Sequence, residues 1–158
     1  MQNLSNKILL FLSTGFGTGF VPYMPGTIGT LAAVPIFLIV SGNSPIHVAL
    51  ILLLLIVSIP LGDWAEKHFK KKDPGEFVFD EIVGYLIAVL MIPWDVGYTA
   101  LAGFILFRIF DVAKPPPIRR TQKLTGGLGI VIDDVLAGIC ANLVLRLLLL
   151  GKPYLAGA

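Results

Sequence analysis

Long apolar runs separated by short polar stretches dominate this chain and predict an all-helical protein. None of the runs alternates apolar and polar residues, as the strands of a membrane β-barrel would. We therefore expect helices over residues 28–40, 46–61, 82–93, 97–110 and 135–150. The pattern also predicts a short interfacial helix over residues 4–14 and a loop over the glycine- and proline-rich residues 15–26.

The composition indicates a protein embedded in a membrane. Hydrophobic residues make up 56% of the 158 residues and charged residues only 14%, whereas soluble domains carry about 25% charged residues. The length fits one domain, so we expect a single membrane-embedded domain over residues 1–158. A helix needs about 20 apolar residues to cross a membrane, and several of the runs are shorter than this. We expect Pro35 and Pro60 to kink or end their helices.

Net charge and cysteine content argue against a nucleic-acid partner and against sites built from several cysteines. A net charge of +2 is too small to suggest a nucleic-acid partner. The single cysteine, Cys140, excludes an intrachain disulfide and a cysteine-rich metal site.

The basic residues indicate how the chain is oriented. Loops 63–79 and 111–132 hold most of the lysines and arginines, whereas loops 41–45 and 93–96 hold none. By the positive-inside rule the two basic loops face the cytoplasm. Threading the five helices through this assignment brings the acids at positions 80, 81, 111, 133 and 134 to the cytoplasmic side. The charge rule did not require this convergence, which is the main argument for one active site.

Two adjacent acid pairs, Asp80-Glu81 and Asp133-Asp134, stand where predicted helices begin. An aspartate at a helix start often caps free N–H groups, which explains Asp80 and Asp133. Capping does not explain Glu81 and Asp134, which follow at once. Mg²⁺ takes oxygen ligands and usually uses one or two carboxylates, with water and phosphate oxygens as the rest. From these residues alone, metal binding and capping stay equally open.

Two basic residues accompany a fifth acid near the end of a predicted helix. Arg108, Asp111 and Lys114 are three residues apart and can share the end of one helix before three prolines stop it. A snorkelling arginine with a local ion pair would explain Arg108 alone. Close to the acid pairs, these cations would hold phosphate oxygens and stabilise transition-state charge.

Glycine-rich turns precede two helices, at residues 25–30 and 125–129. A helix start with free N–H groups favours anions. Thr27 is explained equally well as an N-cap, and Gly126-Gly127 as a turn. Neither stretch fits the Walker or dinucleotide patterns.

Small residues form a stripe on two of the helices and predict close helix packing. One stripe begins at Glu81 and the other at Asp134, so the packed faces would carry both acids inward. The members are Glu81, Gly84, Tyr85 and Ala88, and Asp134, Ala137, Gly138 and Ala141.

These segments resemble the phosphatidylglycerophosphatase A family. The matching stretches appear in the family's order and read PGTIGTL at 25–31, FDEIVG at 79–84, FRIFDVAKPPP at 107–117 and GGLGIVIDDVLAG at 126–138. The resemblance covers most of the chain from about residue 15 to 145. It implies a Mg²⁺-dependent lipid phosphatase that hydrolyses the terminal phosphomonoester of phosphatidylglycerol phosphate, giving phosphatidylglycerol and inorganic phosphate. It also implies a membrane-embedded bundle of about five to six helices, in which a central helix is surrounded by others.

The resemblance and the residues together imply a site. Asp80, Glu81, Asp133 and Asp134 would hold Mg²⁺, and the expected phosphate-binding residues are Thr27, Thr30, Arg108, Lys114, Gly126 and Gly127. Asp80, Asp111 and Lys114 are the expected catalytic residues, with Asp111 orienting Lys114 or accepting a proton from the attacking water. The substrate would stay in the cytoplasmic leaflet of a bacterial inner membrane.

Three other functions stay open at this point. A phosphatase for other phospholipid monoesters, such as phosphatidic acid, would need the same site. A cation or proton carrier would place acids near helix centres, lining a path across the membrane, whereas here they gather at one end. A structural membrane subunit would have no use for the grouped acids.

Overall fold

The computed structural model describes residues 4–121 and 124–150, and every regular element in these residues is helical. The all-helical prediction is therefore confirmed. Residues 1–3, 122–123 and 151–158 belong to the predicted domain 1–158 but lie outside the described residues. The elements are α1 (Leu4–Ser13), the 3₁₀ helix η1 (Thr18–Phe20), α2 (Pro25–Val40), α3 (Ser44–Phe69), α4 (Phe79–Ala88), α5 (Val96–Ala113), α6 (Pro116–Thr121) and α7 (Gly126–Leu150).

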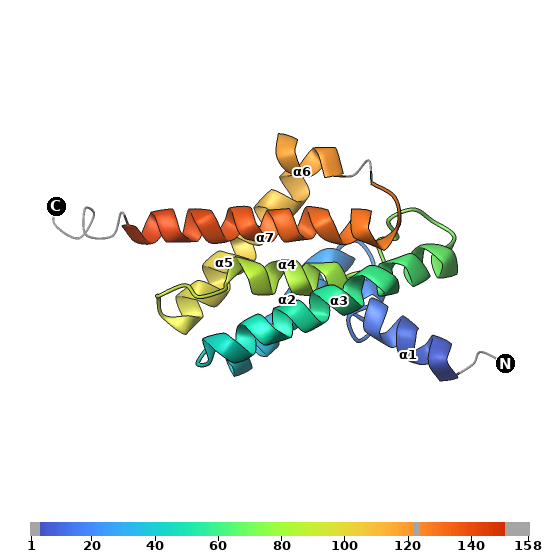
Figure 1. Cartoon of the computed structure of the whole chain (residues 1–158), viewed down its shortest axis with the longest axis horizontal. Helices are drawn as coiled ribbons and strands as arrows, with labels where there is room; N and C mark the ends of the chain where they lie inside the picture. The colour runs from blue at the N-terminus through green and yellow to red at the C-terminus, as the bar shows by residue number, and fades with distance from the viewer. Residues whose placement is uncertain (1–3, 122–123, 151–158) are drawn as a thin grey trace.

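The short helix α4 lies at the centre of the bundle. Helices α2, α3, α5 and α7 all pack against it, and eight of its ten residues are buried. Figure 1 shows it between α3 and α7. Its side chains Tyr85 and Leu86 join Phe107 of α5 in the main hydrophobic core. The prediction of a central helix surrounded by others is therefore confirmed.

Helices α4 and α7 touch backbone to backbone. A Cβ atom added at Gly138 would lie 2.3 Å from the carbonyl oxygen of Gly84. One added at Gly84 would lie 2.7 Å from the carbonyl oxygen of Asp134 and 2.5 Å from the ring of Phe107. Only glycine fits at both positions, and the predicted small-residue contact is confirmed. The contact holds the acids of α4 beside those of α7.

Side chains of α7 satisfy the carbonyl groups at the far end of α4. Asn142 Nδ2 donates to the carbonyls of Ile87, Ala88 and Leu90 at 2.9–3.1 Å. Arg146 donates through Nε to Asn142 Oδ1 and through a terminal nitrogen to the carbonyls of Leu90 and Met91. A helix end leaves such carbonyls without partners, which is costly in an apolar environment. These two polar residues therefore allow α4 to end inside the bundle.

Several helix boundaries differ from the prediction. Helix α2 continues past Pro35 and α3 continues past Pro60 to Phe69. Packing against neighbours outweighs the single hydrogen bond that each proline removes. Pro116 begins the short helix α6 instead of only stopping α5.

Helix α7 begins at Gly126, nine residues earlier than predicted, so the prediction that Asp133 caps it is wrong. Asp63 of α3 takes the capping role, because its Oδ1 accepts from the N–H of Gly127 at 2.6 Å. Asp80 does not cap α4 either: Val78 occupies the N-cap position, and Asp80 Oδ1 accepts only from the adjacent N–H of Glu81 at 3.0 Å.

Helices α3, α5 and α7 are long and apolar enough to cross a membrane. The α3–α4 connection and the start of α7 lie at one end of the bundle, whereas the α2–α3 and α4–α5 connections lie at the other (Figure 1). The lysine-rich loop is thus separated from the uncharged loop 41–43 by the length of the bundle, as the topology prediction requires.

Candidate active site

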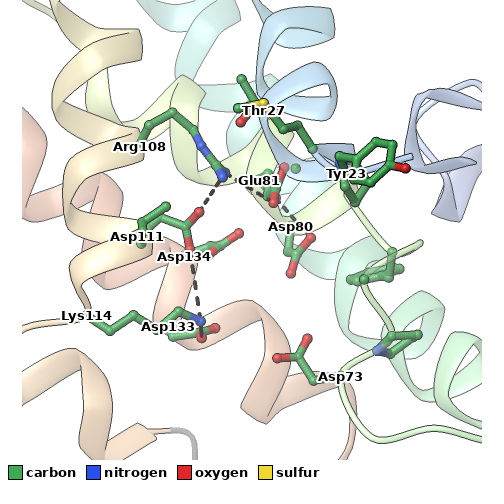
Figure 2. A pocket seen from close by; sticks show the side chains of 17 residues that line it. Tyr23, Thr27, Asp73, Asp80, Glu81, Arg108, Asp111, Lys114, Asp133 and Asp134 are labelled. Atoms are coloured by element: carbon green, nitrogen blue, oxygen red, sulfur yellow. Dashed lines mark hydrogen bonds and ion pairs between the residues drawn. The ribbon is translucent and has the colours of Figure 1, made fainter. Parts of the chain in front are cut away.

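A pocket of about 410 Å³ opens where the predicted acids converge. The start of α2, the α3–α4 loop, the start of α4, the end of α5 and α7 all contribute to its lining. Figure 2 shows that side chains from these separate segments point toward one another. The charged lining residues are Asp73, Asp80, Glu81, Arg108, Asp111, Lys114, Asp133 and Asp134. The predicted convergence of the acids is confirmed.

Arg108 links α5 to α4 inside the pocket. Its Nη1 lies 2.6 Å from Asp111 Oδ2, one helical turn away, and 3.2 Å from Glu81 Oε1. The side chains of Arg108 and Glu81 are only 18% and 14% exposed. Partial burial strengthens these charged hydrogen bonds and fixes the orientation of the guanidinium group.

Lys114 links the end of α5 to α7. It terminates α5 in the left-handed conformation, with φ at 40°, and its N–H donates to the carbonyl of Phe110 at 2.9 Å. Its Nζ pairs with Asp133 Oδ2 and lies 4.0 Å from Asp111 Oδ1. Burial alone would lower the pKa of Lys114. The hydrogen bond to Asp133 and the negative charges of nearby acids raise the pKa by more than burial lowers it, so the net shift is upward. Lys114 therefore stays charged at neutral pH.

Asp80 and Asp134 face the same pocket, whereas Arg108 and Lys114 make their ion pairs with other acids. Asp80 is 6% exposed and Asp134 is 3% exposed. The Oδ2 atom of Asp134 is buried without a hydrogen-bond partner. An unpartnered carboxylate oxygen at this depth is costly, and it indicates that a cation or donor belongs beside it.

The pocket holds more negative than positive side chains, and the two acids of α4 that line it, Asp80 and Glu81, have raised pKa values. Burial raises the pKa of Asp80 well above its ordinary value, and the charges of Glu81, Asp73 and Asp133 add to this. Burial also raises the pKa of Glu81, to about 7, although the positive charge of Arg108 opposes the shift. Six acidic and two basic side chains line the pocket among the described residues, an excess of four negative charges when all are ionised (6 − 2 = 4).

The donor set fits a hard divalent cation. Carboxylate oxygens are the ligands that Mg²⁺ prefers, and Asp134 supplies one that nothing else uses. Within residues 4–121 and 124–150, no three His, Cys, Asp or Glu side chains are grouped as a ready-made metal cage. Mg²⁺ needs only one or two protein carboxylates when water and phosphate oxygens complete its shell. Asp80 and Asp134 meet that requirement, whereas Glu81 and Asp133 already pair with basic residues.

The predicted phosphate-binding residues divide into two groups. Thr27, Arg108 and Lys114 line the pocket. Thr30 is fully buried beneath it, and its hydroxyl donates to the carbonyl of Gly26 at 2.9 Å and lies 3.5 Å from Glu81 Oε2. This places Thr30 behind Glu81, as a support for that carboxylate.

Gly126 and Gly127 are not among the residues that line the pocket. The N–H of Gly127 is bonded to Asp63, and a Cβ at this position would lie 1.8 Å from the carbonyl oxygen of Ile59 on α3. Close packing of α7 on α3 therefore explains the glycine here. Gly126 instead lines a separate surface groove beside Lys67 and Lys70. Substrate binding by these two glycines stays a prediction.

The structure adds pocket residues that the sequence did not single out. Asp73 faces the acids from the α3–α4 loop, and Tyr23, Met24 and Val112 form part of the rim. The only signal for Asp73 is its place as an acid between three lysines and a Pro-Gly turn. The rim residues carry no chemical signal, because exposed apolar residues are common throughout a membrane protein.

Comparison with known proteins identifies the family of this chain. The family model described as phosphatidylglycerophosphatase A matches residues 11–149. A phosphatidylglycerophosphatase A of Escherichia coli (strain K12) is 35% identical over 130 residues, covering 81% of this chain and 76% of the relative. One of Haemophilus influenzae is 39% identical over 145 residues, covering 90% and 88%.

A third relative bears a different name. A putative phosphatidylinositol-3-phosphatase of Bacteroides thetaiotaomicron is 37% identical over 139 residues, covering 82% of this chain and 86% of the relative. No solved structure matches the chain. The family match extends over nearly all the described residues and includes every charged residue of the pocket, so the chain is a phosphatase that belongs to the phosphatidylglycerophosphatase A family.

Proposed function

We propose that this enzyme is a Mg²⁺-dependent phosphatase that releases the terminal phosphate of phosphatidylglycerol phosphate to give phosphatidylglycerol. One observation carries the proposal. A single pocket combines two held cations, Arg108 and Lys114, with two deeply buried acids, Asp80 and Asp134, that those cations leave without an ion pair. A metal and a phosphate group together would complement both halves of this charge pattern.

The substrate's phosphate would bind on the cationic side of the pocket. The planar guanidinium group of Arg108 can donate to two phosphate oxygens, and Glu81 and Asp111 hold it in place. Lys114 adds a second positive charge from the end of α5. Thr27, in the first turn of α2, would add a hydroxyl donor. These groups would also stabilise the charge that develops on the phosphoryl oxygens in the transition state.

Asp80 and Asp134 would hold the metal, with Glu81 and Asp133 acting on it indirectly through Arg108 and Lys114. When bound, Mg²⁺ supplies Lewis-acid stabilisation of the phosphoryl oxygens. This division modifies the initial expectation that all four acids of the two pairs hold the metal. It rests on the two ion pairs and on the unpartnered Oδ2 atom of Asp134.

Asp111 lies between Arg108 and Lys114, where it could orient the attacking water and accept its proton. We assign direct attack by water, in which a new P–O bond forms as the ester P–O bond breaks. Asp111 would accept a proton of the attacking water, and the lipid oxygen, once its bond to phosphorus has broken, would take up a proton from bulk water and leave as a hydroxyl. Lys114, whose raised pKa keeps it protonated, would stabilise the leaving oxygen electrostatically.

The membrane setting follows from the same geometry. Three helices could cross a bilayer, and the pocket opens at the end of the bundle that carries the lysine-rich loop. By the positive-inside rule this end would face the cytoplasm. The substrate would then react in the cytoplasmic leaflet of a bacterial inner membrane, with its acyl chains left in the lipid.

Other substrates compete with this assignment. The name of the Bacteroides relative makes phosphatidylinositol 3-phosphate a specific alternative headgroup, and phosphatidic acid presents the same phosphomonoester without a headgroup. A cation carrier is less well supported, because the pocket's acids gather at one end of the bundle instead of lining a path across it.

The test is phosphate release by purified protein in detergent micelles containing each of the three lipids, with Mg²⁺ or with a chelator. We expect release from phosphatidylglycerol phosphate to be fastest and to require Mg²⁺. Asp80→Asn and Asp134→Asn should abolish it. Asp95→Asn is the matched control, because Asp95 caps α5 at the other end of the bundle and asparagine caps equally well. No release from any lipid would overturn the proposal, and faster release from another lipid would overturn the substrate assignment.

A further inference from the structure

The rim of the pocket has an apolar part and a polar part. Tyr23 and Met24, just before α2, and Val112, in the last turn of α5, line the pocket and are 99%, 57% and 72% exposed. Another part of the rim comes from the α3–α4 loop, where Asp73 and Gly75 are exposed. A rim of this kind suits a boundary between lipid and water.

The apolar side of the rim continues along α5. Leu101, Ile105, Ile109 and Val112 are all exposed and follow one another at spacings of four, four and three residues. Such spacings place side chains on one face of a helix. Helix α5 is one of the three helices able to cross a membrane. An apolar stripe therefore runs along a candidate membrane span and ends at the pocket.

A similar stripe runs along α2, which packs against α5. Leu31 and Leu38 are exposed and lie seven residues apart, which places them on one face of α2, and the exposed Met24 precedes Leu31 by the same interval. Met24 is the N-cap residue immediately before α2 and also lines the pocket. Two neighbouring helices thus carry apolar stripes that reach the same rim.

The charged end of these stripes is suited to a phosphate. Arg108 lies four residues before Val112, so the cation that would bind phosphate and the apolar residue at the rim are neighbours on α5. A molecule with a phosphate at one end and hydrocarbon at the other would match both features at once. Neither a soluble phosphomonoester nor a polar protein surface would use the apolar stripe.

We propose that the lipid substrate enters the pocket sideways from the bilayer, passing over Val112 and Met24, with its acyl chains against the stripes on α5 and α2. This inference rests on the proposed function and adds the route and the selectivity for an acylated substrate. Lateral entry leaves the chains in hydrocarbon, so no apolar surface has to pass through water. Val112 and Met24 then select lipid phosphomonoesters over soluble ones without touching the reacting phosphate.

The test compares kcat/KM for phosphatidylglycerol phosphate in mixed micelles with kcat/KM for its deacylated, water-soluble analogue. Val112→Gln and Met24→Gln should each lower the ratio of lipid to soluble kcat/KM by about tenfold, the discrimination typical of one apolar contact. The matched control is Ile56→Gln, because Ile56 is 71% exposed on α3 but does not line the pocket. An unchanged ratio in both rim variants, or an equal fall in the control, would overturn lateral entry.

A binding measurement keeps the inference testable even if the soluble analogue is not hydrolysed. Val112→Cys in a Cys140→Ala background places a lone thiol at the rim. Without Mg²⁺, phosphatidylglycerol phosphate should slow the reaction of this thiol with a bilayer-soluble maleimide, and phosphatidylglycerol should slow it less. Equal labelling rates with and without the substrate lipid would contradict the proposal. Failure of the proposed function would differ, since the unmodified protein would then release no phosphate from the lipid.

Discussion

Lys114, which ends α5, forms an ion pair with Asp133, nineteen residues later on α7. Both residues line the pocket, and the carboxylate of Asp133 has Lys114 as its partner, whereas the adjacent Asp134 keeps a buried oxygen without a partner. Two neighbouring acids on one helix therefore have different environments, and they should respond differently to the same substitution.

Asp133→Asn should weaken catalysis while leaving metal binding largely intact. The amide can still accept a hydrogen bond from Lys114 but no longer fixes it by charge, so we expect kcat/KM to fall by about 10-fold to 100-fold, as for other groups that orient an active-site residue. The Mg²⁺ concentration for half-maximal activity should stay within about threefold of the unmodified protein, because metal ligation is left to Asp80 and Asp134. Steady-state kinetics at varied Mg²⁺ tests both, and a large shift in the Mg²⁺ requirement would return Asp133 to the metal ligands.

Asp134→Asn should impair metal binding itself, in addition to abolishing phosphate release. The substitution replaces the buried, unpartnered carboxylate, so the Mg²⁺ concentration that half-saturates the protein should rise by more than about tenfold. The rise in unfolding temperature that Mg²⁺ gives the unmodified protein should be lost as well. Thermal unfolding with and without Mg²⁺ measures this independently of activity. Full metal stabilisation in the variant would show that the ion binds elsewhere.

The contact between α4 and α7 predicts a stability effect. In Gly138→Ala the new Cβ would lie 2.3 Å from the carbonyl oxygen of Gly84, so the two helices must separate. We expect a loss of about 1–3 kcal/mol in the free energy of unfolding, the usual cost of overpacking. Gly42→Ala is the control, since a Cβ there meets nothing within 4 Å. Equal unfolding temperatures for the two variants would contradict the contact.

The far end of α4 depends on Asn142. In Asn142→Ala, the carbonyl of Ala88 loses its donor in an apolar setting, whereas that of Leu90 keeps Arg146 and that of Ile87 keeps the N–H of Leu90. We expect a loss of about 1–3 kcal/mol in the free energy of unfolding, the cost of leaving buried polar groups unsatisfied. Asn6→Ala, at an exposed position on α1, should be close to neutral. Denaturation in detergent measures both variants.

The raised pKa of Glu81 predicts how the metal-free protein responds to pH. Burial favours the protonated form in the folded state, so the pKa rises from 4.5 to about 7. The stabilising contribution is complete below the unfolded pKa and is lost as the pH rises through the folded pKa. With a chelator present, the unfolding temperature should therefore fall between about pH 5 and pH 8. Glu81→Gln should flatten this dependence and Mg²⁺ should reduce it, whereas an unfolding temperature that rises with pH would contradict the assignment.

Most of the fold could be predicted because helices facing lipid leave long apolar runs in the sequence. The starts of helices were harder to place. Helix α7 begins in the polar, glycine-rich stretch at Gly126, because Asp63 of α3 satisfies its first amides and the close packing on α3 requires glycine there. A partner 64 residues away in sequence leaves no local signal.

Most of the charged residues of the pocket were predictable, but their pairing between helices was not. The charged motifs and the positive-inside rule placed the acids and cations at one end of the bundle. The pair between Arg108 and Asp111 follows from their spacing of three residues. The pairing of Arg108 with Glu81 and of Lys114 with Asp133 depends on how α4, α5 and α7 cross, which no spacing in the sequence encodes. The glycine turn at 126–127 resembles an anion site locally, yet Asp63 occupies the amide of Gly127.

The glycine contact between α4 and α7 has a consequence for ion choice. Because backbone meets backbone at Gly84 and Gly138, moving α4 and α7 apart would open a void in close packing, so the helices that carry Asp80 and Asp134 resist separation. Ca²⁺ takes six to eight ligands at about 2.3–2.6 Å, whereas Mg²⁺ takes six at about 2.0–2.1 Å. If the proposed metal site cannot expand, it would bind the smaller Mg²⁺ in preference to Ca²⁺. The two glycines would then contribute to the choice of cation.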